Sequence, residues 1–149
     1  MTKYQPEEVQ KTFKFHVPLQ VRFSDIDGYM HVNNGVFFNY LEHARALYLH
    51  QVCQWDFSTI GAVVANINLD FYQPIHFFDE LQACVRCVRL GRTSFTLEQV
   101  LMGQKQHGNT AVFAGASVTM VTIDMQTMKP SPLPGDYGTK IREQDGPLA

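Results

Sequence analysis

The sequence "VFFNYLEHARALYLHQV", residues 36–52, decides the fold. Its apolar side chains recur every three or four residues, which places them on one side of an α-helix. They are Phe37, Tyr40, Leu41, Ala44, Leu47, Tyr48 and Val52, whereas Asn39, Glu42, His43 and His50 form a flank that faces solvent or an interface. A helix of this length spans about 25 Å, and so wide an apolar stripe requires a sheet packed around it.

The segments on either side of this helix have the alternating pattern of strands. In "TFKFHVPLQVRF", residues 12–23, every second residue is apolar, and Pro18 indicates that the ladder starts after it or that this part lies at a sheet edge. Further strands are expected over 62–74, 79–90, 93–102 and 110–124. Short turns join them, so antiparallel pairing is expected. The pattern predicts an α+β fold in which a curved antiparallel sheet of about five strands wraps a long helix.

Length and charge limit the functions open to the chain. Its 149 residues are 45% hydrophobic, enough for one compact domain with a buried core, which is predicted over residues 1–134. The last residues, 135–149, are polar and are predicted to form a poorly ordered tail. Twelve basic and fourteen acidic residues give a net charge of -2, so no basic field exists to hold nucleic acid. Without a long apolar run or a signal peptide, the sequence predicts a cytoplasmic protein with no membrane insertion.

The three cysteines suggest neither a disulfide framework nor a metal site. An odd, small number of cysteines fits a reducing compartment. Cys84 and Cys87 of "CVRC" fall in a predicted strand, where residues three apart point to opposite faces. They could hardly bind one metal ion, so no metal is expected.

The connector "SDIDGYMHVNN", residues 24–34, carries more polar groups than a turn requires. Asp27 and Gly28 form an ordinary turn pair, and Asn33 or Asn34 would make a good helix N-cap. The same segment could instead be a reactive centre, because it places carboxylates and a histidine at a helix entrance. The residues by themselves leave both interpretations open.

Four segments together resemble the hotdog-fold acyl-CoA thioesterases, the group that includes 4-hydroxybenzoyl-CoA thioesterase and the Tol-Pal-associated thioesterases. They are "VRFSDIDGYMHVNNGVFFNYLEHAR" (21–45), "INLDFYQPIHFFDEL" (67–81), "LGRTSF" (90–95) and "VTMVTID" (118–124), and the likeness covers residues 19–134. The resemblance implies a hotdog fold and hydrolysis of an acyl-CoA to a free acid and CoA, with no cofactor besides the CoA of the substrate. It also implies a homodimer or a dimer of dimers with active sites at the subunit interface.

The resemblance assigns the catalytic carboxylate to Asp27 and leaves Asp25 to orient the loop. A thioester carbonyl needs a nucleophile or a base that activates water, together with donors for the oxygen that becomes negative. Asp27 could take either of the first two roles. Backbone amides near Asn34, Gly35 and Val36 at the helix start would polarise the carbonyl.

Other residues are expected to bind substrate. His31 could contact the substrate or tune Asp27, although it could equally cap the turn. Arg92 matches a basic position near the nucleotide in relatives, and Ser94 matches a polar position that faces the reacting group. Additional charge could come from Arg86, Arg89 and Lys105. Met30 departs from the family pattern, in which a glycine commonly precedes "HVNN", so the loop and the acyl pocket, which Met30 could line, are expected to differ.

Two other functions remain open at this point. A non-catalytic hotdog module could bind an acyl-CoA or a lipid-like ligand without using Asp27 chemically. A hotdog dehydratase would carry a longer hydration motif, which the sequence does not contain.

Overall fold

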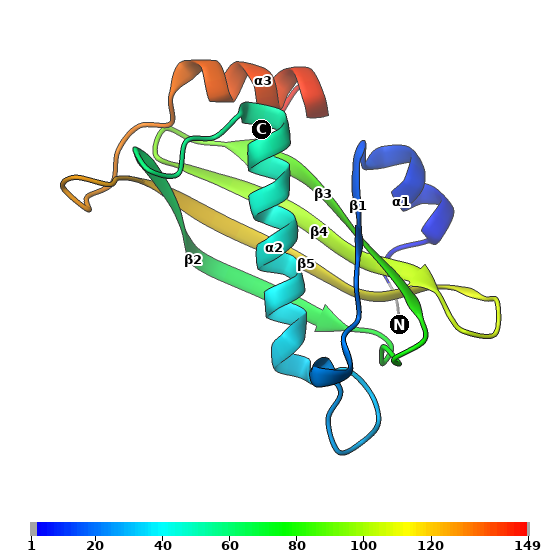
Figure 1. The fold of residues 1–149 in the computed structure, drawn as a ribbon. Helices are drawn as coiled ribbons and strands as arrows, with labels where there is room; N and C mark the ends of the chain where they lie inside the picture. Colours follow the sequence, from blue (N-terminus) through cyan, green and yellow to red (C-terminus); the bar gives the residue numbers. More distant parts are fainter. Residues whose placement is uncertain (1–2, 149) are drawn as a thin grey trace.

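The computed structural model describes residues 3–148 and shows a five-stranded antiparallel sheet curved around one long helix (Figure 1). The strand order is β1-β3-β4-β5-β2. The strands are β1 (Phe15–Leu19), β2 (Ile60–Phe71), β3 (Glu80–Leu90), β4 (Ser94–Gln104) and β5 (Thr110–Asp124), and the helices are α1 (Pro6–Thr12), the short 3₁₀ helix η1 (Phe23–Asp25), α2 (Asn34–Cys53) and α3 (Gly135–Asp145). The predicted hotdog fold is confirmed.

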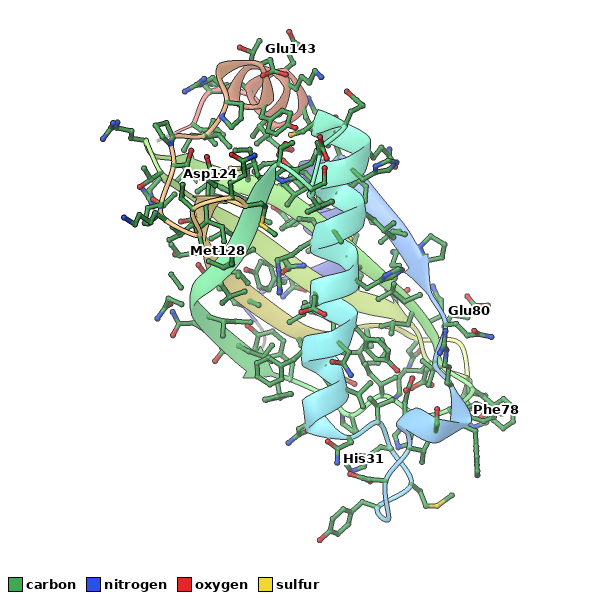
Figure 2. The ribbon with its side chains drawn as sticks, turned by 60° about the vertical axis from the view of Figure 1, so that its left-hand side comes forward. His31, Phe78, Glu80, Asp124, Met128 and Glu143 are labelled. Atoms are coloured by element: carbon green, nitrogen blue, oxygen red, sulfur yellow. The ribbon has the colours of Figure 1, made fainter. Side chains whose placement is uncertain are left out.

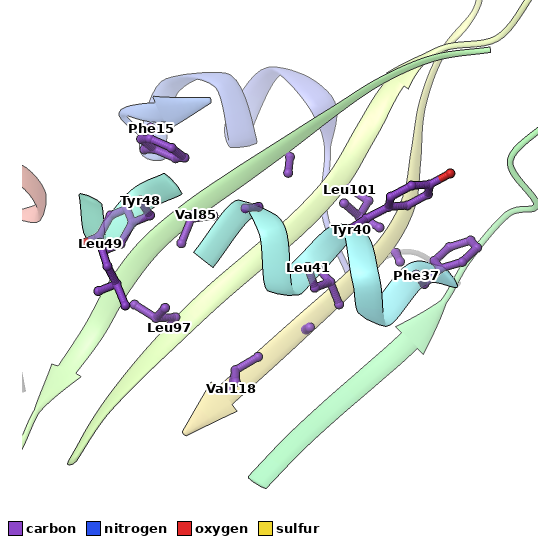
Figure 3. Close-up of a cluster of buried hydrophobic side chains, with 14 of the residues drawn as sticks. Phe15, Phe37, Tyr40, Leu41, Tyr48, Leu49, Val85, Leu97, Leu101 and Val118 are labelled. Atoms are coloured by element: carbon purple, nitrogen blue, oxygen red, sulfur yellow. The ribbon is translucent and has the colours of Figure 1, made fainter. Parts of the chain in front are cut away.

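The main core lies between α2 and the concave face of the sheet, as Figure 3 shows. Leu41, Ala44 and Tyr48 of α2 are fully buried there against side chains of β3, β4 and β5. The Tyr48 ring meets the Phe15 ring edge-on, with ring centroids 5.5 Å apart. The apolar stripe of α2 is therefore buried by the sheet that surrounds it.

None of the helices in residues 3–148 is long and apolar enough to cross a membrane.

Strand β1 is shorter than the alternating pattern predicts. It lies at the sheet edge, where it pairs with β3 from Phe15 opposite Val85 to Leu19 opposite Leu81. The edge position tolerates Pro18, which cannot donate to the ladder. The expected continuation to Phe23 is wrong, because the chain turns into η1 and the Asp25 carboxylate accepts a hydrogen bond from the Arg22 amide at 2.9 Å.

Helix α1 covers part of the opposite face of the sheet. Val9 and Phe13 pack there on Cys84, Val100 and Met102 in a second buried cluster. The sequence "PEEVQKT" carries the signals of a helix start, a proline in the first turn followed by two glutamates.

The expectation of a poorly ordered tail is wrong for most of residues 135–149. Residues Gly135–Asp145 form α3, whose Ile141 is completely buried and whose Tyr137 ring stacks on Trp55 at 4.7 Å. The Asp145 carboxylate accepts hydrogen bonds from the Cys87 amide, at 2.9 Å, and from the Tyr48 hydroxyl. Although residues 135–149 are mostly polar, Tyr137 and Ile141 lie on one side of α3 and pack on the core. Together with the hydrogen bonds to Asp145, these contacts hold α3 against the rest of the protein.

Cys53, Cys84 and Cys87 are buried free thiols in the structure. Cys87 belongs to the core beneath α2, whereas Cys84 belongs to the cluster beneath α1, so the two point to opposite faces of β3. Burial raises the pKa of Cys84 to about 12 and that of Cys87 to about 11. Both remain protonated at neutral pH, and no group of three or more metal-ligating side chains occurs among residues 3–148.

Candidate active site

The segment between η1 and α2 is a closed loop that is fixed to the body of the protein. Ile26 and Val32 form a bridge across its base, and the Asp27 amide donates to the His31 carbonyl at 3.0 Å. The Val32 amide donates to the carbonyl of Ile75, in the connection after β2, at 2.8 Å. The loop projects at the end of the molecule where Figure 2 labels His31 and Phe78.

Asp27 lies in this loop with its carboxylate partly open to solvent. Its Oδ1 accepts a hydrogen bond from the Tyr29 amide at 2.9 Å and lies 4.0 Å from Nδ1 of His31. The side chain of Asp27 is 23% exposed. The His31 ring stacks on Tyr29 and meets His76 edge-on. The structure therefore offers an anchored carboxylate with an oxygen available to a substrate or a water molecule.

Asp25 is committed to holding the loop. Its carboxylate accepts hydrogen bonds from the Tyr40 hydroxyl at 2.6 Å and from the Arg22 amide at 2.9 Å, while its carbonyl accepts from the Asn33 amide at 2.9 Å. Burial and the bond to Asp25 raise the pKa of Tyr40 above its ordinary value. These contacts join the loop to α2 and are those of an orienting residue.

The start of α2 differs in detail from the prediction. Asn33 is the N-cap: its side-chain oxygen accepts from the Gly35 amide at 2.8 Å, and its carbonyl accepts from the Val36 amide at 2.9 Å. Two of the three amides expected to polarise the thioester carbonyl are therefore already bonded. The Asn34 amide donates to no acceptor among residues 3–148, so it is the donor that this helix end leaves open.

Gly35 keeps the cap compact. A Cβ atom at this position would lie 3.1 Å from Oδ1 of Asn33, which is closer than ordinary van der Waals contact. A glycine also lets a substrate approach the backbone closely, but at Gly35 the adjacent space is occupied by the N-cap side chain of Asn33.

A pocket of about 270 Å³ opens at this helix end. The Phe37 and Phe71 rings, with centroids 5.0 Å apart, belong to its apolar part. The complete lining is His31, Val32, Asn34, Phe37, Phe71, Tyr72, Gln73 and Pro74. An apolar wall beside a few polar groups is the usual composition of a small-molecule site.

Arg92 and Ser94 lie at the opposite end of the sheet from Asp27. The Asp27 loop follows β1, whose end pairs with the start of β3, whereas Arg92 follows the end of β3. β3 has 11 residues and therefore spans roughly 35 Å. Ser94 accepts a hydrogen bond from the Arg89 guanidinium at 3.0 Å, and the Arg92 carbonyl accepts from the Leu133 amide. One chain does not bring these two residues and Asp27 into a single site.

Two of the other predicted cations are already paired. The Arg86 guanidinium binds the Glu98 carboxylate at 2.6 Å, and the Lys105 ammonium binds the Asp79 carboxylate at 3.0 Å. Both pairs lie within the chain, so these charges serve local structure.

Comparisons with known proteins identify the family. The profile described as "Thioesterase superfamily" matches residues 29–109, more than half of the chain. The chain belongs to the thioesterase superfamily. It is 31% identical over 128 residues to the long-chain acyl-CoA thioesterase FadM of Escherichia coli (strain K12), covering 84% of this chain and 95% of that protein.

Solved structures agree with this assignment. A thioesterase from Thermus thermophilus, solved with coenzyme A and zinc, is 32% identical, with a TM-score of 0.78 over 93% of this chain and 99% of that one. A mutant of 4-hydroxybenzoyl-CoA thioesterase bound to 4-hydroxybenzoyl-CoA has the same TM-score at 15% identity, over 85% of this chain and 97% of that one, which shows the shared fold. The predicted hotdog thioesterase family is confirmed, and the protein is a thioester hydrolase.

Met30 holds a backbone conformation in this thioesterase that favours glycine. Its φ is +67°, in the left-handed region, and its side chain is 71% exposed. This backbone geometry suits the glycine that the family resemblance leads us to expect before "HVNN". Within one chain, Met30 does not line the pocket at the helix start.

We predict that Met30→Gly stabilises the enzyme by about 0.5–1 kcal/mol, because glycine adopts a positive φ without the steric cost that other residues pay. Met30→Ala removes the same exposed side chain but keeps the Cβ atom, so it is the matched control and should give no gain. Urea unfolding of the three proteins at one concentration measures the difference. Equal stability of the glycine and alanine variants would contradict the backbone explanation.

Sequence reasoning missed the pocket residues outside the "SDIDGYMHVNN" loop. Phe71 is the last residue of β2, Gln73 lies in the connection after it, and Phe37 belongs to the first turn of α2. Pro74, where the predicted strand was expected to end, is the one sequence signal that this segment stops near the helix start. Their meeting at one site depends on the order of strands in the sheet, which no local pattern encodes.

Proposed function

We propose that this thioesterase hydrolyses acyl-CoA thioesters and that the Asp27 carboxylate drives the reaction. The observation that carries the proposal is the position of Asp27, anchored by the Tyr29 amide in the loop that leads to the open Asn34 amide. As nucleophile, Asp27 attacks the carbonyl carbon, the carbon–sulfur bond breaks, and a mixed anhydride of the acyl group and Asp27 forms; water then hydrolyses the anhydride to the free acid and restores the Asp27 carboxylate. As base, Asp27 takes a proton from the water that attacks the carbonyl carbon, the carbon–sulfur bond breaks, and Asp27 passes that proton to the sulfur. In both routes the products are the free acid and CoA as the thiol, with the sulfur proton coming from water.

The Asn34 amide and the positive end of α2 are suited to the oxygen that becomes negative during this step. A preorganised donor at that oxygen commonly lowers the barrier by about 3 kcal/mol. The apolar pocket formed by Phe37 and Phe71 would hold the acyl group next to the carbonyl, and His31 would border the pocket on its polar side.

We propose that the active form is a homodimer built on β2. One edge of β2 pairs with β5, and the other edge has no partner among residues 3–148. Val63, Val64 and Phe71 of this strand are each 44% exposed. A long unpaired edge with apolar side chains is a surface that proteins normally cover. A second copy paired antiparallel here would also bring its own Arg92 end toward the Asp27 end of the first copy.

The experiment is release of free thiol from short, long, branched and aromatic acyl-CoAs. Long-chain thioesters are the first choice, because the relative that is 31% identical is named a long-chain acyl-CoA thioesterase. We expect hydrolysis of at least one class well above the uncatalysed rate. If the folded protein binds acyl-CoA but hydrolyses none of them, it acts as a binding module and the proposal fails.

A further inference from the structure

Arg45 is a buried guanidinium without an anionic partner. It lies in the middle of α2 and is 7% exposed. Its Nη1 donates to the side-chain oxygen of Gln99 at 3.2 Å, and Gln99 donates in turn to the Leu41 carbonyl at 3.0 Å. No carboxylate among residues 3–148 lies within ion-pair distance of it. Burying a charge without a partner lowers the stability of the fold, so an anion beside this guanidinium would be strongly favoured.

The guanidinium borders a cavity on the side of α2 that faces β2. The cavity measures about 450 Å³, and Leu49, Phe57, Val63 and Met120 are among its apolar walls. Every fully buried side-chain nitrogen and oxygen in residues 3–148 has a hydrogen-bond partner. Arg45 has five N–H donors but bonds a single side-chain acceptor. Its nitrogen atoms without a partner are therefore not fully buried, and they face the cavity that Arg45 lines.

Among residues 3–148, Glu42 is the only acidic residue that lines the same cavity. It is exposed, and its side chain makes no ion pair with any residue in 3–148. Burial lowers the pKa of Arg45, and the charge of Glu42 opposes that effect only from a distance. One face of α2 therefore carries two opposite charges that do not pair within the chain.

The positions of these two residues are symmetric about the centre of the helix. α2 spans Asn34–Cys53, so Glu42 and Arg45 are equally far from its midpoint, on either side. When two identical helices cross antiparallel at their midpoints, each residue faces the one placed symmetrically on the other copy. Val63 and Val64, in the first half of β2, line the same cavity, so the middle of α2 lies beside the strand whose outer edge has no partner among residues 3–148.

We infer that this face of α2 docks on the same face of a second copy, with Glu42 of each chain paired to the partner subunit's Arg45. The inference rests on the homodimer proposed above and adds the contact that fixes its register. Two reciprocal ion pairs supply the missing anion for both buried guanidinium groups. They also fix how far each chain's Arg92 end reaches toward the other chain's Asp27.

Sedimentation equilibrium of the full chain tests the pairing. Glu42→Lys places two additional cations against the buried Arg45 groups, and we expect the dimer dissociation constant to rise about a hundredfold or more at low salt. Glu143→Lys, which changes the same charge on the exposed face of α3, is the matched control and should leave the constant unchanged. The exchange variant with Glu42→Arg and Arg45→Glu restores the two pairs and should recover most of the affinity.

A Glu42→Lys dimer as tight as the wild type would overturn the inference. So would a monomeric wild type that binds decanoate through Arg45, since a ligand carboxylate would then be the missing anion. If the exchange variant does not fold, the comparison of Glu42→Gln with Glu143→Gln decides, because only the first should weaken the dimer, by about tenfold. These readouts do not involve catalysis, so a dimer held by these pairs yet inactive would refute the proposed function and leave the pairing intact.

Discussion

Asp27→Asn is expected to lower the kcat for acyl-CoA hydrolysis by about 10²–10⁴-fold while the protein remains folded. Asparagine has the same shape as aspartate, and its carbonyl oxygen can still accept the hydrogen bond from the Tyr29 amide. What it loses is the negative charge needed to attack the carbonyl or to take a proton from water. KM should change little, because the pocket formed by Phe37 and Phe71 is untouched.

The matched controls separate chemistry from structure. Asp136→Asn removes an exposed carboxylate in the first turn of α3, at the other end of the molecule; it should leave kcat unchanged and lower stability by at most about 1 kcal/mol through the helix dipole. Asp25→Asn should lower stability, because Asp25 accepts from the Tyr40 hydroxyl and the Arg22 amide. Thiol release at saturating substrate and urea unfolding of each variant give the two measures. Full activity in Asp27→Asn would exclude Asp27 from the chemistry.

The fold could be predicted because the spacing of apolar residues along the sequence indicates most of its helices and strands. The apolar spacing from Phe37 to Val52 identifies α2, and alternation with short turns identifies the strands that follow it. The failures have a common origin. The end of β1 depends on a hydrogen bond from Arg22 to Asp25, and α3 depends on the packing of Ile141 against elements distant in sequence. Such contacts exist only once the chain has folded.

The candidate site was predictable to a similar depth. Asp27 and His31 lie close together because they are only four positions apart in one loop. The Gly35 amide was expected to be free for a substrate, but it donates to the side chain of Asn33. The sequence indicates that asparagine is favoured at an N-cap, but not which amide its side chain will bind. The separation of Arg92 from Asp27 follows from the length of β3, and a second chain is needed to bring such ends together.

Asp79→Asn is expected to be the most destabilising single change outside the core, by about 2–4 kcal/mol at pH 7. The Asp79 side chain is 2% exposed and holds two loops together. Its carboxylate accepts from the His76 amide at 2.8 Å, the Gln106 amide at 2.9 Å and the Lys105 ammonium at 3.0 Å. Asparagine keeps the shape but loses the charge and turns a donor toward these donors.

The effect should depend on pH in a defined direction. Burial alone would raise the pKa of Asp79, but the hydrogen bonds from His76, Gln106 and Lys105 outweigh it and hold the pKa below its usual value. A depressed native pKa stabilises the fold above the unfolded value of about 4 and loses that contribution as pH falls through the native pKa. The stability gap between wild type and Asp79→Asn should therefore narrow below about pH 4.

Urea unfolding at pH 7, 5 and 3, at one protein concentration, measures this gap. Glu80→Gln, which neutralises the exposed carboxylate next in the chain, is the control and should show almost no gap at any pH. A gap for Asp79→Asn that is absent at pH 7, or that stays constant down to pH 3, would mean that the charge of Asp79 does not hold the two loops. A stability difference that is large at pH 7 and smaller at pH 3 would show that the charge of Asp79 holds the connection after β2 against the turn between β4 and β5. That connection also carries the pocket residue Gln73.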